Sequence, residues 1–127
     1  MSKTSDLRRL VNALVKPIIP RVYYRRASSS AQFPYAVFTF DRINIDDLHL
    51  DVFDLRFDLW DSAESITRLD DIADTIEKLL HMRNDPQPGI LPTFFRSDRF
   101  YVEESDKTKQ HLELHFDVRL YEREVST

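Results

Sequence analysis

Residues 51–61 read DVFDLRFDLWD, and this stretch decides the fold of the chain. Large apolar residues alternate there with charged residues and a tryptophan: the first set is Phe53, Leu55, Phe57 and Leu59, and the second is Asp54, Arg56, Asp58 and Trp60. A period of two sends the two sets to opposite faces of a β-strand. The pattern predicts a half-buried strand, which must pair within a sheet and needs a hydrophobic layer over one face.

The residues just before this strand follow the opposite parity. Leu48, Leu50 and Val52 alternate with polar residues, so the apolar set changes face between Val52 and Phe53. A β-bulge or a turn would produce such a slip in register. Of the two, we favour a bulge in this strand.

Residues 110–122 predict a second strand of the same kind. Its apolar face is Leu112, Leu114, Phe116, Val118 and Leu120, and its polar face is His111, Glu113, His115, Asp117, Arg119 and Tyr121. A shorter strand at 99–103 precedes it, and the polar turn ESDKTK joins the two. We expect opposite charges on neighbouring strands to pair across a wet sheet face, at roughly 0.2–1 kcal/mol for each pair.

Two segments have the spacing of amphipathic helices. The first, at residues 6–16, follows Ser5, which can cap its first turn, and ends before Pro17. Its apolar residues are Leu7, Leu10, Val11, Leu14 and Val15. The second begins after Asp61, a candidate cap with Glu64 in the capping-box position. Its apolar stripe is Ile66, Leu69, Ile72, Ala73, Ile76, Leu79 and Leu80.

The remaining segments predict one more long strand and its connections. RVYY after Pro20 predicts a short strand, and RRASSSAQ after it has no periodicity and predicts a polar loop. FPYAVFTFD, from Phe33, is apolar on both faces, which is typical of a strand in the middle of a sheet. RNDPQPGILP, at 83–92, holds three prolines and the only glycine, so we expect a stiff, irregular connection.

Together these elements predict an α+β fold in a single domain, residues 1–127. We expect one mostly antiparallel β-sheet of about four to five strands, with the two main helices packed on one face. In this arrangement the Ile72, Ile76 and Leu79 stripe packs on the apolar sheet residues Phe57, Leu59, Phe116 and Val118. The length and the 42% of hydrophobic residues suffice for a core of this size.

The composition excludes several classes of function. The chain has no cysteine, which excludes disulfides, thiolate zinc sites and a cysteine nucleophile. The single glycine, Gly89, leaves no material for a phosphate-binding loop or a dinucleotide fingerprint. A formal net charge of −4 argues against a dedicated nucleic-acid binder. No segment has the ~20 apolar residues of a membrane span or the pattern of a secretory signal, so we expect a cytoplasmic protein.

Candidate catalytic and metal-binding residues do not combine into a site. His111 and His115 have the i, i+4 spacing of a helical metal pair, but on a strand they lie about 13 Å apart, too far to share one ion. Two carboxylate pairs share this spacing, Glu113 with Asp117 and Asp54 with Asp58. The spacing disfavours an acid–base pair as well. We expect no enzymatic activity, no metal and no cofactor; a small metal-dependent enzyme stays an alternative.

Charge is distributed unevenly along the sequence. Residues 1–40 contain seven basic residues and one acidic residue, a balance of +6, whereas residues 41–78 contain four and twelve, a balance of −8. Charge scattered over a solvated surface is the commoner explanation of such a pattern. A polarised subunit is also suited to head-to-tail contacts between copies.

The order of these elements resembles the tail terminator or tail completion proteins of long-tailed bacteriophages and prophages. The likeness covers nearly the whole chain. It begins with a short helix (LRRLVNALV) and a loop that leads to a strand starting with FP (FPYAVFTF). A strand with an aromatic and acidic end (DLRFDLWD) runs directly into a helix (SITRLDDIADTIEKLL), and a hairpin with a long last strand (HLELHFDVRLYE) closes the chain.

The resemblance implies a small α+β subunit that forms a six-membered ring on the end of the tail tube, stops tube polymerisation and joins the tail to the head. The implied partners are copies of the chain itself, the tail tube protein and a head–tail connector or neck protein, with no membrane and no specific nucleic acid. The implied location is a virion tail assembled in the bacterial host cytoplasm. No catalytic residue carries over. A monomeric or dimeric neck or adaptor protein of a prophage is the alternative.

Candidate interaction residues follow from charge and from strand position. Arg25 and Arg26 come directly after the short strand, in the basic third of the sequence. The other candidates share the polar faces of two strands: Asp54, Arg56, Asp58, Trp60, Glu113, His115, Asp117 and Arg119. Aromatic residues in charged surroundings, such as Trp60 and Tyr121, are enriched where proteins touch one another.

Overall fold

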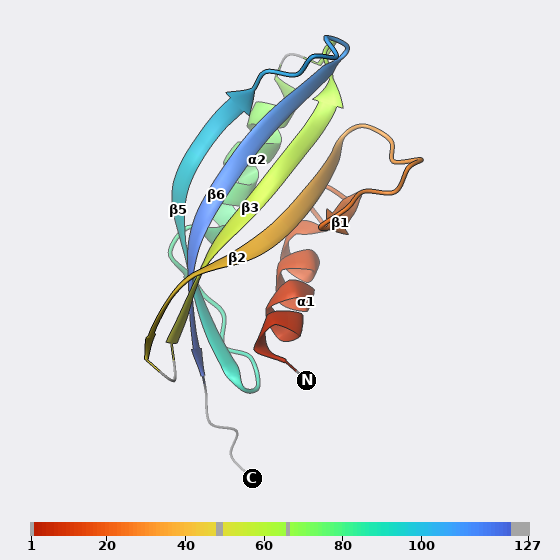
Figure 1. Cartoon of the computed structure of the whole chain (residues 1–127). Helices are drawn as coiled ribbons and strands as arrows, with labels where there is room; N and C mark the ends of the chain where they lie inside the picture. Colours follow the sequence, from red (N-terminus) through yellow and green to blue (C-terminus); the bar gives the residue numbers. More distant parts are fainter. Residues whose placement is uncertain (1, 48–49, 66, 123–127) are drawn as a thin grey trace.

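The computed structural model describes residues 2–47, 50–65 and 67–122. In this part of the chain, six strands form one sheet and two helices lie against it (Figure 1). The elements in chain order are α1 (Lys3–Val15), β1 (Val22–Tyr24), β2 (Tyr35–Asp47), β3 (Leu50–Ser62), α2 (Arg68–Leu80), β4 (Arg83–Asn84), β5 (Ile90–Val102) and β6 (Lys109–Glu122). The strand order is β1-β2-β3-β6-β5-β4; β1 is parallel to β2, and the other pairs are antiparallel. The α+β class and the mostly antiparallel sheet are confirmed.

The expected number of strands was too low, because the sheet has six strands in the described residues. The additional strand is β4, whose two residues pair with Phe94 and Thr93 of β5. It lies in the segment 83–92 that the sequence predicted to be irregular throughout. Two residues at a sheet edge carry no hydrophobic alternation, so the sequence gives no periodic signal for them.

The strand predicted at 99–103 is also longer than expected, since β5 begins at Ile90. Pro92 does not end the strand. Its carbonyl oxygen accepts a hydrogen bond from the Asp85 N–H at 3.2 Å, so its missing N–H faces the edge of the sheet. The pairing of β5 with β6 therefore continues through Pro92, opposite Leu120. The register shifts once, between Arg96 and Arg99.

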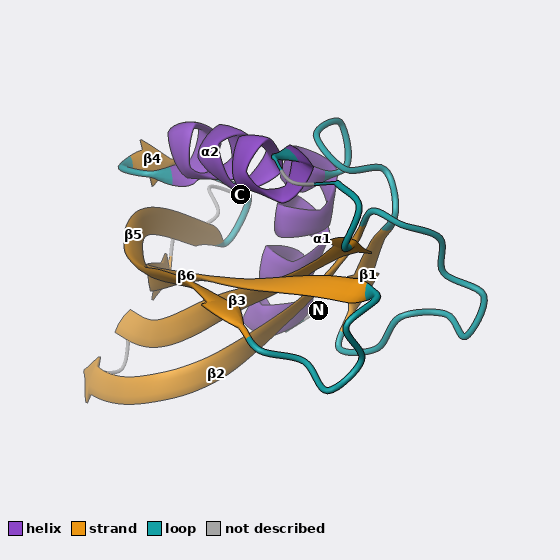
Figure 2. Ribbon diagram, turned by 90° about the horizontal axis from the view of Figure 1, so that it is seen from above, coloured by secondary structure: helices purple, strands orange, loops and turns teal. Residues whose placement is uncertain are grey.

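Both helices cover the same face of the sheet (Figure 2), as predicted. β3 alternates between buried and half-buried residues over its whole length, with Phe53, Leu55, Phe57 and Leu59 in the core. α1 buries Leu7, Val11 and Val15, and α2 buries Leu69, Ala73, Ile76 and Leu80. Ile72 and Leu79 are only partly buried, so Ile76 is the one fully buried member of the predicted contact stripe. Ile66 lies outside the described residues.

The predicted helix caps were wrong. α1 begins at Lys3, and its cap is Ser2, whose hydroxyl oxygen accepts a hydrogen bond from the Ser5 N–H at 3.0 Å. α2 begins at Arg68, because β3 continues to Ser62. Asp61 is buried and accepts a hydrogen bond from Arg68 Nε at 2.7 Å instead of capping the helix. The capping box with Glu64 is therefore not formed.

The register slip predicted between Val52 and Phe53 was wrong, because β3 alternates regularly over its whole length. β3 passes regularly through Val52 and Phe53, but the opposing residues of β2 are Asn44 and Arg42, with Ile43 as an extra residue between them. The bulge at this level of the sheet lies in β2, where the sequence did not predict one. Leu48 lies outside the described residues.

β2 is not in the middle of the sheet. It is second from the edge, because only the three residues of β1 lie beyond it. Ala36 and Phe38 are buried beneath the helices, whereas Tyr35 and Val37 on the other face are half-buried. The aromatic side chains of that face pack against neighbouring rings on the sheet surface, and no second layer covers them in the described residues.

Replacing Ile76 by alanine should lower the free energy of unfolding by about 2–5 kcal/mol, because the side chain is fully buried between α2 and the sheet. Ile72→Ala is the matched control in the same helix and should cost clearly less, since Ile72 is partly exposed. Denaturant unfolding monitored by circular dichroism measures both values. A loss below about 0.5 kcal/mol for Ile76→Ala would contradict this packing.

Candidate interaction surfaces

The sheet face opposite the helices is not covered by any other element in the described chain, and most of the predicted interaction residues lie on it. Eight of them occupy adjacent positions on β3 and β6: Asp54, Arg56, Asp58, Trp60, Glu113, His115, Asp117 and Arg119. We call these eight residues the open face. The structure therefore brings them together as the sequence predicted. Arg25 and Arg26 lie apart from them, after β1 at the edge of the sheet.

The register places like charges directly opposite one another on the open face. Asp54 lies opposite Asp117, and Asp58 lies opposite Glu113. Such pairs destabilise a sheet unless other charges compensate for them. The prediction that opposite charges pair between the two strands is confirmed. The pairs join residues that are offset by two positions along the strands and not directly opposite.

Arg56 and His115 provide this compensation. Arg56 Nε donates to Asp58 Oδ2 at 3.1 Å and lies 3.6 Å from Glu113 Oε1. His115 Nδ1 lies 3.1 Å from Asp54 Oδ1, and its Nε2 lies 3.6 Å from Glu113 Oε1. The centre of the open face is therefore a network in which the charges are satisfied within the molecule.

His111 forms a clamp at one end of this network. Its ring is buried, with Nε2 at 2.6 Å from Asp58 Oδ1 and Nδ1 at 2.7 Å from Glu104 Oε1. Ionised carboxylates only accept hydrogen bonds, so both ring nitrogens donate and the imidazole is protonated. The clamp ties Glu104, in the connection between β5 and β6, to the middle of the sheet.

The surroundings of His111 favour its charged form. Burial alone would lower the pKa of His111, but the hydrogen bonds to Asp58 and Glu104 outweigh it, and the pKa is raised above its ordinary value. The Trp60 ring stacks on the imidazole with a centroid distance of 4.0 Å and an interplanar angle of 11°. An aromatic face next to a cation adds to the stabilisation.

Trp60 belongs to a row of stacked rings that crosses the end of the sheet. Tyr35 stacks on Trp60 with centroids 6.3 Å apart, and Phe33 stacks on Tyr35 at 5.8 Å. The row ends at His111, directly opposite Trp60 in the register of β3 and β6. Trp60 was predicted to lie at an interface, but the row itself has no signal in the sequence, because the ring contacts join three segments that are distant in sequence.

The basic third of the sequence forms a separate surface around α1 and β1. Arg25 adopts φ = 68°, a left-handed conformation that is unfavourable for a residue with a side chain, and its N–H donates to the Phe38 carbonyl oxygen at 2.9 Å. Arg25 and Arg26 are both exposed. Neither makes an ion pair with any residue in the described part of the chain.

On the helix side of the sheet, Arg99 joins β5 to α2. Its guanidinium lies 2.6 Å from Asp74, 2.8 Å from Glu77 and 3.1 Å from Asp70. The burial of Arg99 opposes ionisation, but the three hydrogen bonds to carboxylates outweigh it and raise the pKa. This cluster was not predicted, although the i, i+4 and i+7 spacing of its acids on one helix face was a signal for it.

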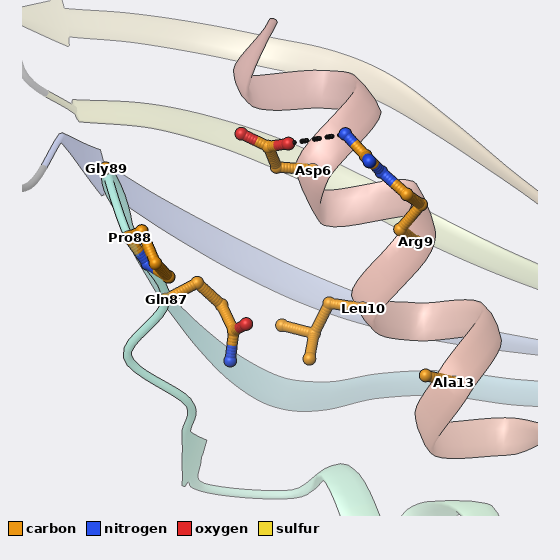
Figure 3. A pocket seen from close by; sticks show the side chains of 7 residues that line it. All are labelled: Asp6, Arg9, Leu10, Ala13, Gln87, Pro88 and Gly89. Atoms are coloured by element: carbon orange, nitrogen blue, oxygen red, sulfur yellow. Dashed lines mark hydrogen bonds and ion pairs between the residues drawn. The ribbon is translucent and has the colours of Figure 1, made fainter. Parts of the chain in front are cut away.

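A hollow of about 630 Å³ lies between α1 and the turn before β5 (Figure 3). It is lined by Asp6, Arg9, Leu10, Ala13, Gln87, Pro88 and Gly89. The one carboxylate of this lining, Asp6, already accepts a hydrogen bond from Arg9 at 2.8 Å. These lining residues include no histidine, serine or cysteine.

The described residues were also compared with the requirements of a metal site and of a membrane-spanning helix, and they meet neither. No group of three or more histidine, cysteine, aspartate or glutamate side chains there is arranged to hold a metal ion. Within the same ranges, neither helix has the length and apolar character that crossing a membrane requires.

Comparison with known proteins gives a likeness of fold. No protein-family model and no curated protein matches the sequence. The structure is similar to a solved chain in the virion of a native gene transfer agent particle, with a TM-score of 0.70 and 11% sequence identity. The match covers 86% of this chain and 85% of that chain. At this identity the shared property is the arrangement of helices and strands.

The His111 clamp predicts a characteristic dependence of stability on pH. Because the folded pKa is raised, the stabilisation is complete below about pH 6.5, the unfolded value, and is lost as the pH rises through the folded pKa. Wild type should therefore exceed His111→Gln in free energy of unfolding by more at pH 6 than at pH 9, by roughly 1 kcal/mol. Urea unfolding at both pH values measures the two differences. Equal differences would show that His111 is not a charged clamp.

Proposed function

We propose that this chain is a tail terminator, or tail completion, subunit of a tailed bacteriophage or a phage-like particle. It forms a ring at the end of the tail tube, stops tube polymerisation and joins the tail to the head. The observation that carries the proposal is the fold, which is similar over most of its length to a chain of a gene transfer agent virion. The order of elements, with a long final hairpin that ends in β6, agrees with the resemblance seen in the sequence.

The chemistry of the surface supports a structural role over an enzymatic one. Asp54 and Asp58 are one of the two carboxylate pairs considered above for acid–base catalysis. Asp54 is bonded to His115, and Asp58 is bonded to Arg56 and His111. These contacts use the groups that a reaction would need free. A protein of this kind works through its surfaces, and its location is the virion.

Ring formation is supported by the placement of charge. Arg25 and Arg26 lie at the β1 edge of the sheet, whereas the acidic helix α2 packs over β3 and β5. Surfaces of opposite sign at different ends of one subunit suit heterologous contacts, in which a patch on one copy meets a different patch on the next. Such contacts can close into a ring, whose two rims would meet the tail tube protein and the head–tail connector or neck protein.

Changing Arg25 and Arg26 together to glutamate should leave the fold intact and abolish capping of tail tubes. Changes at exposed loop positions usually alter stability by no more than about 0.5 kcal/mol, whereas like charges across an interface cost several kcal/mol. The variant should be a folded monomer, and tubes assembled with it should have uncontrolled length. Electron microscopy of tubes mixed with the protein, together with circular dichroism of the variant, measures both effects.

Lys107→Glu/Lys109→Glu is the matched control, because it makes the same change of charge at two exposed positions, one in the turn before β6 and one at the first residue of β6. It should cap tubes as wild type does. If wild type never caps a tube end and stays a monomer or dimer that binds the neck, the chain is an adaptor instead. If the Arg25/Arg26 variant caps tubes normally, these arginines have no part in the ring.

A further inference from the structure

A second hollow lies on the basic side of the molecule, where α1 meets the edge of the sheet. It has a volume of about 230 Å³ and is lined by Arg8, Arg9 and Asn12 of α1, Tyr24 of β1 and Phe38 of β2. We call it the basic groove. Its floor is aromatic and its rim carries two guanidinium groups and an amide. A site of this composition recognises carboxylates, because guanidinium groups bond them in a planar, two-point geometry.

Of the two arginines that line the groove, Arg9 bonds the Asp6 carboxylate at 2.8 Å, whereas Arg8 has no carboxylate partner within the described residues. The Arg8 guanidinium lies over the Tyr24 ring, 5.3 Å from its centroid, and makes no ion pair. The same holds, in the described ranges, for Lys16, Arg21, Arg25 and Arg26. By contrast, Arg56, Arg68 and Arg99 each bond a carboxylate of their own subunit.

The Arg8 guanidinium contacts the Tyr24 ring but bonds no carboxylate in the described residues. The cation–π contact with Tyr24 holds the guanidinium beside the groove without using its N–H groups in an ion pair. Arg8, Asn12 and Lys16 follow one another at four-residue spacing, so they line one side of α1. The groove thus holds one cation, Arg8, that is positioned by an aromatic ring and has no anion bonded to it in the described residues.

We propose that the basic groove receives the acidic surface of α2 from a second copy of this chain. This surface consists of Asp70, Asp71 and Asp74 on the first turns of α2 together with Glu64 in the preceding connection. Asp71 and Glu64 are exposed and make no ion pair with the described residues, and Arg99 is the one cation that contacts Asp70 and Asp74. The occupant is identified by charge complementarity with the groove.

The two surfaces cannot meet within one subunit. The groove is formed at the β1 end of the strand order, by α1, β1 and β2. α2 contacts β3 and β5, further along the sheet. A second copy must bring them together, and the resulting contact joins unlike patches, as ring closure requires. The inference rests on the proposed function for its biological setting, but the contact itself can be tested without tail tubes.

The test is a charge exchange between two variants of the full chain. The first carries Arg8→Glu and Arg25→Glu, and the second carries Glu64→Lys and Asp71→Lys. Sedimentation velocity at low salt should show self-association of wild type that weakens as salt is added. Each variant alone should associate roughly a hundred-fold more weakly, because like charges face each other. An equal mixture of the two should assemble again, since each altered surface then meets one of opposite sign.

The mixture also controls for folding, because a misfolded variant cannot be rescued by its partner. The chain that carries all four changes should likewise assemble, and Lys107→Glu/Lys109→Glu should behave as wild type. The proposal is overturned if wild type stays monomeric with and without tubes, if the mixture fails to assemble, or if the groove variant loses binding of duplex DNA while its self-association is unchanged.

The two proposals fail in different ways. If the mixture assembles but neither it nor wild type caps tail tubes, the contact between copies stands and the tail terminator function is wrong. If wild type caps tubes and both charge variants do so equally well, the function stands and the basic groove is not the contact between copies.

Discussion

The register between β3 and β6 is the constraint on which the rest of the structure depends. It runs without a shift from Leu50 opposite Tyr121 to Ser62 opposite Lys109. It places Phe57 beside Leu114 and Leu55 beside Phe116, all without exposed surface, and these residues form the floor on which both helices rest. A slip of one residue would turn the charged set toward the helices, where unpaired charges are very costly. The hydrophobic layer therefore fixes the register.

The same register creates the electrostatic problem of the open face, because it brings carboxylates opposite carboxylates. Arg56 and His115 offset this repulsion, because they lie between the acids and bond carboxylates diagonally across the two strands. At the end of the row His111 bonds one oxygen each of Asp58 and Glu104. A surface that neutralises its own charges has less to gain from a charged partner, since a new contact must first compete with the internal one. The candidates for charged contacts with other subunits are consequently found away from the centre of the sheet.

The division of charge along the sequence becomes a division in space through the positions of the helices. α1 and β1 carry the basic third to one edge of the sheet, where Arg8, Arg25 and Arg26 make no ion pair with the described residues. α2 carries an acidic surface across β3 and β5, where a single arginine from β5 contacts three of its carboxylates. The fold therefore keeps the two signs apart, and the unsatisfied charges of one copy are complementary to those of another.

By itself, the sequence determined the features that depend on local period and composition. The alternation in residues 53–59 and 112–120 specified the buried faces of β3 and β6, and the helical spacing specified α2 with Ile76 at its centre. Only the tertiary structure decided the partners of polar groups. Asp61 could cap a helix or bind a guanidinium, and the path of the chain before Arg68 selected the second. His111 depends on Asp58, 53 residues away, and Arg99 on α2, so their roles follow from contacts that no local pattern encodes.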